Sequence, residues 1–168
     1  MNTWFPIYDI TTKLRVTHFL AQSIVETADF SAMTENAAHK GMEYEPDTRA
    51  GQRVGNHYPG DGPMFIGRGL LHLTGRDNYK RFGEKIHEDL VNHPERVAKE
   101  YNLAFRTACA FWQARKLNNF ADLDDFPEIT RRVNGGRNGR EIREQALTEI
   151  KRALHIKINE RMPIYFNV

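Results

Sequence analysis

The sequence predicts a mainly α-helical fold. Apolar residues recur at steps of three and four in several segments of the 168-residue chain, which is the spacing of one helix face. Threonine, proline and glycine stand where these segments begin or end, as helix caps do. A hydrophobic share of 40% and a charged share of 27% are typical of a globular protein, and the length fits one domain over residues 1–168.

The first predicted helix covers residues 14–26, where apolar side chains follow the helical period. Thr11 or Thr12 can cap its start. A second helix is predicted over residues 70–86, although two glycines, Gly75 among them, weaken it.

The second half of the chain predicts three more helices. Residues 103–112 form the richest apolar segment and are expected at the centre of the core. A short helix begins at Pro127 and ends at Gly135-Gly136, and a long helix covers residues 142–154. Residues 36–65 show no clear period and are expected to form a long ordered loop or a short hairpin.

Composition excludes several classes of protein. A net charge of +2 argues against a dedicated nucleic-acid binder. Cys109 is the only cysteine, so no intramolecular disulfide forms, and its apolar setting predicts a small buried hydrophobe. The seven histidines lack the spacing of a zinc site, so no metal or cofactor is expected. No signal peptide or membrane span is recognised, and the early first helix suggests a missing upstream domain.

The most informative segment is residues 59–79. It places five glycines and two prolines around one aromatic side chain, Phe65, and then runs into an apolar segment. Such glycine density predicts a shaped loop at a cleft, because glycine permits close approach and unusual backbone angles. The side chains that follow can donate, accept or stack, and so suit a hydroxyl-rich ligand such as a glycan: His72, Thr74, Arg76, Asn78 and Tyr79.

This segment resembles the glycoside hydrolase family 19 chitinases and their bacteriophage endolysin relatives. The shared pattern is Gly67-Arg68-Gly69, an apolar pair, Leu73-Thr74-Gly75 and Asn78-Tyr79. Two further blocks, residues 15–36 and 129–139, match in family order. The resemblance implies a lysozyme-like helical domain with two lobes and a glycan-binding cleft.

Glycosidic bond cleavage commonly needs two carboxyl groups. Glu26 ends the first predicted helix, where the helix dipole and apolar neighbours favour a raised pKa and therefore a general acid. Glu35 follows in a polar, irregular stretch and is expected to stay ionised, as a base must. The ordinary alternative is that both are surface glutamates. The resemblance aligns Glu26 with the family's acid and Glu35 with the second acidic position of phage-type members.

The sequence departs from the family around the acid. Val25 stands where the family usually has histidine, which predicts more apolar surroundings for Glu26. Asp29 adds a third carboxyl group nearby and is an alternative to Glu35 as the base.

The resemblance also implies substrate-binding residues. Thr74 and Asn78 match positions that contact sugar or hold the catalytic water, and Asn134 matches an asparagine that reaches into the cleft, although each could be a turn or capping residue. His72 replaces the usual glutamine and can still hydrogen-bond a sugar. Phe65 replaces the usual tyrosine and either stacks on a sugar or packs the loop.

Two other function classes are compatible with parts of the sequence. Arginines between residues 131 and 143 surround a glycine turn, which loosely resembles a DNA-binding helix-turn-helix, although glutamates offset them. A glycan-binding module without activity is the other alternative.

The resemblance to the bacterial and phage branch of the family therefore implies a peptidoglycan hydrolase, a muramidase that acts with inversion at the anomeric carbon, with a chitinase as the alternative. Peptidoglycan strands are the expected partner and a monomer the expected state, without nucleic acid or membrane. Whether an immunity or inhibitor protein binds is open. The expected place of action is the bacterial periplasm and cell wall, reached through a phage lysis pore or a secretion apparatus.

Overall fold

The fold is built almost entirely from helices. The computed structural model describes residues 1, 3–135 and 139–156, and this part contains only helices and two isolated β-bridges as regular structure. The mainly α-helical prediction is thus confirmed. The helices are α1 (Trp4–Ile7), α2 (Lys13–Glu26), η1 (Met42–Tyr44), α3 (Arg49–Val54), α4 (Asp61–Met64), α5 (Arg76–Ile86), α6 (Arg96–Lys99), α7 (Tyr101–Ala114), α8 (Leu117–Asp122), α9 (Phe126–Asn134) and α10 (Arg140–Ala153).

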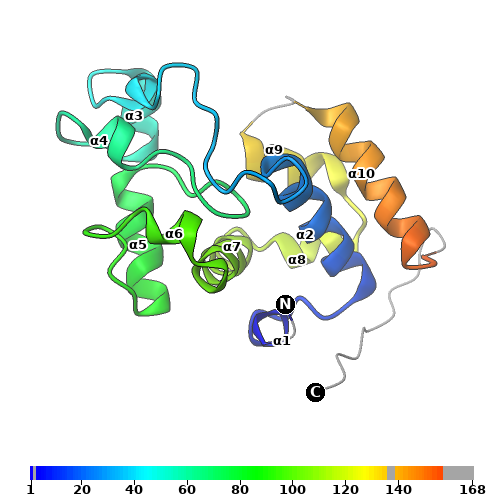
Figure 1. Cartoon of the computed structure of the whole chain (residues 1–168). Helices are drawn as coiled ribbons and strands as arrows, with labels where there is room; N and C mark the ends of the chain where they lie inside the picture. Colours follow the sequence, from blue (N-terminus) through cyan, green and yellow to red (C-terminus); the bar gives the residue numbers. More distant parts are fainter. Residues whose placement is uncertain (2, 136–138, 157–168) are drawn as a thin grey trace.

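The helices form two groups, with α7 between them (Figure 1). One group holds α3, α4 and α5, and the other holds α2, α8, α9 and α10, where α10 packs along α2. The long segment after α2 crosses from the second group to the first. This crossing carries the chain from Glu26 to Glu35 and so places the two carboxyl groups on different elements.

The core lies where α2 and α7 meet. Phe19 stands edge-on to Phe5 at 5.0 Å and to Trp112 at 5.3 Å between ring centroids, and all three side chains are fully buried. The other side of α2 contributes Ala21 to a second cluster with α9 and α10. Because α2 is packed on both sides, its last residue, Glu26, has a rigid base.

Four of the predicted helices are present close to their expected bounds. In α2 the Thr12 hydroxyl accepts a hydrogen bond from the Arg15 amide, so Thr12 is the cap. In α9 the cap is Asp125, and the helix ends before Gly135, whose φ is 70°. The helices expected over 103–112 and 142–154 correspond to α7 and α10.

The predicted helix over residues 70–86 begins too early. Only α5, from Arg76, is helical, because Gly75 has a φ of 91° and His72 a φ of 44°, both incompatible with a continuing right-handed helix. The prediction of a loop or hairpin over 36–65 is also incomplete, since η1, α3 and α4 lie there. Helices of three to six residues are too short to show a period.

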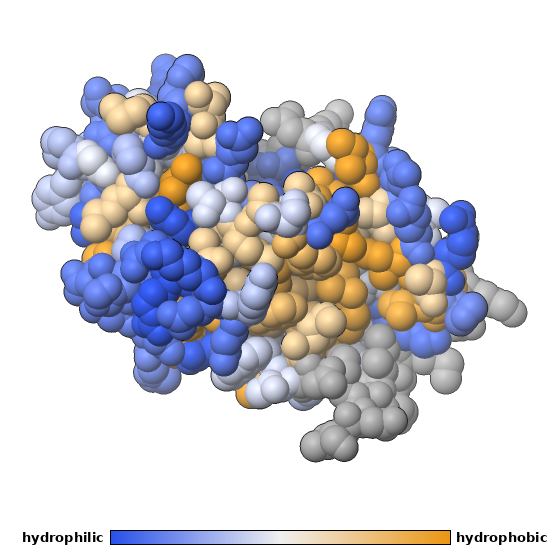
Figure 2. Space-filling model, in the orientation of Figure 1, coloured by the Kyte–Doolittle hydropathy of each residue, from blue (hydrophilic) through white to orange (hydrophobic). Residues whose placement is uncertain are grey.

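Surface and burial agree with this arrangement. Figure 2 shows hydrophilic residues gathered over α5 and α6 and more hydrophobic ones over the middle of the molecule, near α7 and α2. Cys109 is fully buried in α7, and burial raises the pKa of its thiol to about 12, so it is a core side chain as predicted. Among the described residues, no helix is both long and apolar enough to cross a membrane.

Candidate active site

A cavity of about 480 Å³ brings together most of the predicted site residues. Its walls come from both groups of helices: the end of α2, the segment after it, η1, α3, α5, α7 and the end of α9. Glu26 and Glu35 both line it. The remaining lining residues are Tyr44, Arg53, Val54, Leu71, His72, Leu73, Thr74, Asn78, Phe111, Arg115, Arg132, Val133, Asn134 and Gly135.

Glu26 is the last residue of α2, and its carboxylate is held by two side chains from distant parts of the chain. Arg143 Nη2 donates to Glu26 Oε1 at 2.7 Å, and His72 Nδ1 lies 3.3 Å from Glu26 Oε2. Only 15% of the Glu26 side chain is exposed. The carboxylate is thus oriented from both sides, with little access to water.

The prediction of a raised pKa for Glu26 is wrong. Burial does raise the pKa of this carboxyl group, but the hydrogen bond from His72 and the charge of Arg143 outweigh burial and leave the pKa below its usual value. Val25 therefore does not leave Glu26 in apolar surroundings, because His72 supplies the polar neighbour. The free protein holds Glu26 as a carboxylate at neutral pH.

Arg143 links Glu26 to the helices behind it. The side chain is 5% exposed, and Nη1 donates to Gln22 Oε1 at 2.8 Å. Gln22 in turn donates through Nε2 to the Thr130 hydroxyl at 3.0 Å. This chain of polar contacts, Thr130–Gln22–Arg143–Glu26, joins α9, α2 and α10 inside the protein.

Glu35 is held by a different set of groups. Its Oε1 accepts a short hydrogen bond from the Gly67 amide, and its Oε2 accepts one from the Tyr44 hydroxyl at 3.1 Å. The Glu35 amide also donates to the Gly67 carbonyl at 2.9 Å. Burial and the neighbouring Glu35 charge raise the pKa of Tyr44 to about 12, so Tyr44 remains a hydrogen-bond donor.

Gly67 is required by this close approach. A Cβ atom at Gly67 would stand 2.7 Å from Glu35 Oε1 and 3.0 Å from His72 Cβ, which leaves no room for a side chain. Isolated β-bridges pair Thr34 with Arg68 and Arg68 with Leu73. They fix the backbone next to Gly67 and His72, the residues that contact the two carboxylates. The glycine-rich loop therefore positions Glu35 through its backbone and Glu26 through His72.

The other predicted polar residues also reach the cavity. The Thr74 hydroxyl donates to the His72 carbonyl at 2.9 Å, and Asn78 Nδ2 donates to the Thr74 carbonyl at 2.8 Å. These bonds stabilise the end of the loop while both side chains line the cavity. Asn134, at the end of α9, lines the cavity from the other group of helices.

Two predicted candidates lie elsewhere. Phe65 is fully buried and does not line the cavity; its ring packs 5.3 Å from Tyr79, and the guanidinium carbon of Arg76 stands 4.6 Å from the Phe65 ring centroid. Of the two expectations for Phe65, packing of the loop is the one observed. Asp29 is exposed and is not a lining residue, so among the described residues Glu35 is the one carboxyl group that lines the cavity with Glu26.

Sequence reasoning missed the arginines and Tyr44. Arg143 belongs to the arginine cluster around the glycine turn in the sequence, but its side chain is buried against Glu26, and Arg132 pairs with Glu128 at 2.6 Å. Arg140 pairs with Glu144, while Arg137 lies outside the described residues. The helix-turn-helix resemblance therefore loses a free basic face, because most of its described arginines have carboxylate partners.

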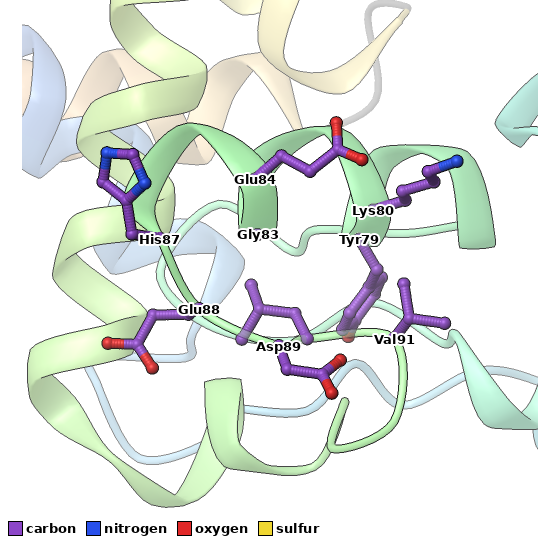
Figure 3. Close-up of a pocket in the computed structure, with 9 residues that line it drawn as sticks. Tyr79, Lys80, Gly83, Glu84, His87, Glu88, Asp89 and Val91 are labelled. Atoms are coloured by element: carbon purple, nitrogen blue, oxygen red, sulfur yellow. The ribbon is translucent and has the colours of Figure 1, made fainter.

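A second depression, beside α5, does not belong to this site (Figure 3). It measures about 520 Å³, and its lining includes Glu84, Glu88 and Asp89 but neither Glu26 nor Glu35. In the described part of the chain, no three or more histidine, cysteine or acidic side chains are grouped to hold a metal ion.

Comparison with known proteins identifies the family. The family described as class I chitinases of glycoside hydrolase family 19 matches residues 7–123. A glycosyl hydrolase family 19 domain-containing protein of Haemophilus influenzae is 30% identical over 152 residues, which cover 76% of this chain and 74% of that protein. An acidic 27 kDa endochitinase of Solanum lycopersicum is 32% identical over 110 residues, and these cover 66% of this chain but only 40% of the tomato protein.

The fold agrees with the family. Chitinase C of Streptomyces griseus HUT6037 superimposes with a TM-score of 0.69 at 22% identity, over 85% of this chain and 60% of that one. A class IV chitinase of Zea mays gives a TM-score of 0.67, over 89% of this chain and 74% of its own. The lysozyme-like helical fold implied by the sequence is thus confirmed, and the chain belongs to glycoside hydrolase family 19 as a glycosidase of the chitinase type.

Proposed function

We propose that this protein hydrolyses the β-1,4 bonds of peptidoglycan as a muramidase, with Glu26 as general acid and Glu35 as general base. The observation that carries the proposal is the meeting of two carboxylates from separate elements in one cavity of about 480 Å³. Their described partners are distinct, since Arg143 and His72 hold Glu26 while Gly67 and Tyr44 hold Glu35. Two carboxyl groups with separate partners can take separate roles.

Glu26 must gain a proton before it can donate one to the leaving oxygen. His72 and Arg143 keep it ionised in the free protein, so acidic conditions favour the active form. Substrate that fills the cavity would remove water and favour the neutral acid further. The remaining hydrogen bonds would then orient the carboxyl group toward the scissile bond.

Glu35 would activate a water for attack on the opposite face of the sugar. Its two hydrogen bonds hold both oxygens, so the carboxylate is oriented before substrate arrives. A single displacement with inversion needs room for that water, roughly 6.5–9.5 Å between carboxyl groups. The placement of the two residues on separate elements supports this mechanism, and the first-formed anomer, read by NMR, tests it.

Charge in the cavity supports peptidoglycan as the substrate. Arg53, Arg115 and Arg132 line it together with the two glutamates. Chitin is neutral, whereas peptidoglycan carries carboxylates on its peptide stems, and a cationic lining attracts an anionic polymer. Chitin is the second candidate, because the tomato relative is called an endochitinase.

The test is digestion of purified peptidoglycan and of a soluble chitin hexasaccharide by the same preparation. We expect new reducing ends at N-acetylmuramic acid, identified by borohydride reduction and mass spectrometry. Reducing ends at N-acetylglucosamine alone, or release of free stem peptide, would contradict a muramidase.

Variants assign the roles. Glu26→Gln and Glu35→Ala should each lower turnover by about 100-fold or more, because acid or base help is lost. Asp29→Asn is the matched control: it removes a nearby carboxylate that is exposed and outside the cavity, and activity should persist. Loss of activity in Asp29→Asn with retention in Glu35→Ala would reverse the assignment of the base.

A further inference from the structure

Three arginines gather beside the cavity that holds the carboxylates. Arg81, Arg115 and Arg132 line a pocket of about 340 Å³, together with Asn78, Phe82 and Ala114. Asn78, Arg115 and Arg132 also line the carboxylate cavity, so the two spaces adjoin. We call Arg81, Arg115 and Arg132 the arginine pocket. It extends the cavity beyond the residues assigned to chemistry.

The charge of the arginine pocket is mostly uncompensated. Arg132 pairs with Glu128, but Glu128 is shared with Arg131, also at 2.6 Å. Neither Arg81 nor Arg115 lies within 4.0 Å of a carboxylate oxygen of the described residues. Burial and the charges of Arg81 and Arg132 lower the pKa of Arg115, as expected of guanidinium groups held close together.

Aromatic rings hold these guanidinium groups in place. The distance from guanidinium carbon to ring centroid is 4.7 Å for Arg115 on Phe111 and 4.3 Å for Arg132 on Phe120. Arg81 stands 5.5 Å from the Phe82 ring. Stacking orders a guanidinium while leaving its edge free to donate. Arg132 already donates through Nε to Glu128, but Arg81 and Arg115 have no carboxylate within 4.0 Å among the described residues, and like charges held together in this way favour an anionic ligand.

We propose that the arginine pocket binds a carboxylate of the peptidoglycan peptide stem and so selects peptide-bearing strands over neutral glycans. The inference rests on the proposed function and adds the recognition of the stem to it. Guanidinium forks match carboxylates, and the pocket adjoins the cavity that would hold the glycan.

The test compares three substrates: soluble uncross-linked peptidoglycan strands, the same strands with carboxyl groups converted to amides, and a chitin hexasaccharide. Arg81→Gln is the variant, since Arg81 lines the arginine pocket but not the carboxylate cavity. Lys80→Gln is the matched control, because it removes the same charge from the neighbouring exposed residue of α5 and lies outside the pocket.

We expect Arg81→Gln to raise KM on native strands about 5-fold with kcat unchanged, the size of one partly exposed charge-assisted contact. It should change nothing on amidated strands or on the hexasaccharide, and Lys80→Gln should resemble wild type on all three. Amidation should raise the wild-type KM.

Equal cleavage of native and amidated strands by wild type would overturn the proposed role of the arginine pocket. It would not contradict the proposed muramidase activity. An equal loss of activity by Arg81→Gln on all three substrates would indicate a merely structural role for Arg81. That result would also overturn the proposed binding of a stem carboxylate. Cleavage of the hexasaccharide with no cleavage of either peptidoglycan would overturn the proposed function, and the inference with it. Inhibition by inorganic phosphate without any effect of amidation would show a phosphate ligand instead.

Discussion

At the scale of single residues, Glu26 shows how neighbours decide protonation. Burial opposes its charge, yet His72 and Arg143 more than offset burial and lower its pKa. The position of Glu26 at a helix end among apolar residues therefore does not set its pKa. The two contacts that lower the pKa come from residues 46 and 117 positions away in the sequence. For a general acid, a lowered pKa in the free protein narrows the pH range of activity.

The pH profile of kcat/KM should decline as pH rises from about 4 to 8, because this ratio reports the free enzyme and fewer molecules then carry the Glu26 proton. His72→Ala removes a group that lowers the Glu26 pKa, so the descending limb should move to higher pH. His72→Gln keeps a donor and should move it less. An unchanged limb in His72→Ala would remove His72 from control of the acid.

Gly67→Ala should lower turnover on any substrate by about 100-fold, the usual effect of misplacing a reacting group by about 1 Å. The added Cβ would meet Glu35 Oε1 at 2.7 Å and displace it. Gly60→Ala is the control, since a Cβ there meets nothing within 4 Å and only its φ of 90° is strained. That variant should melt at a lower temperature and keep its turnover. Retained turnover in Gly67→Ala would show that Glu35 tolerates movement.

At the scale of elements, the polar chain Thr130–Gln22–Arg143–Glu26 joins three helices that apolar packing also holds together. Helices α2, α7, α9 and α10 could be predicted because each is long enough to show a period. The short helices η1, α3 and α4 could not, and the start of α5 was misplaced because a glycine at φ 91° looks like any helix glycine in sequence. The pairing of Arg143 with Glu26 depends on how α10 packs against α2, and a local sequence pattern does not predict the packing of one helix on another.

Glu26→Gln should lower the free energy of unfolding at pH 7 by about 1–3 kcal/mol, because a buried guanidinium loses its charged acceptor. The folded-state pKa of Glu26 lies below its unfolded value. Its contribution is thus fully present above about pH 4.3 and is lost as pH falls through the folded pKa. Urea unfolding at pH 7 and at pH 3 should show the two proteins converging in acid. A gap independent of pH would mean that charge is not the cause.

At the scale of the whole molecule, two groups of helices face each other across a cavity with mixed charge. The three sequence blocks correctly indicated the family, and six of the predicted site residues line the cavity: Glu26, Glu35, His72, Thr74, Asn78 and Asn134. Phe65 was ambiguous, since an aromatic in a loop looks the same whether it stacks on a ligand or packs inside. No sequence pattern marked Arg53 and Arg115 as site residues, because they line the cavity only through the packing of distant parts of the chain.

Binding to peptidoglycan should weaken with salt. The cationic lining should make KM for peptidoglycan strands rise several-fold between 50 and 500 mM salt, over which the Debye length shrinks to a few ångströms from about 14 Å. KM for a neutral chitin hexasaccharide should hardly change. If KM for both substrates responded to salt in the same way, electrostatic attraction would not explain a preference for peptidoglycan.

The buried contact between Arg143 and Glu26 has a consequence for how this protein can evolve. In many enzymes the active-site groups cost stability, so selection for robustness alone tends to erase them. Here the proposed acid neutralises an arginine that is 5% exposed, and its loss would leave a buried charge unmatched. A laboratory lineage selected only for heat tolerance, with hydrolysis ignored, should therefore keep the carboxylate at position 26.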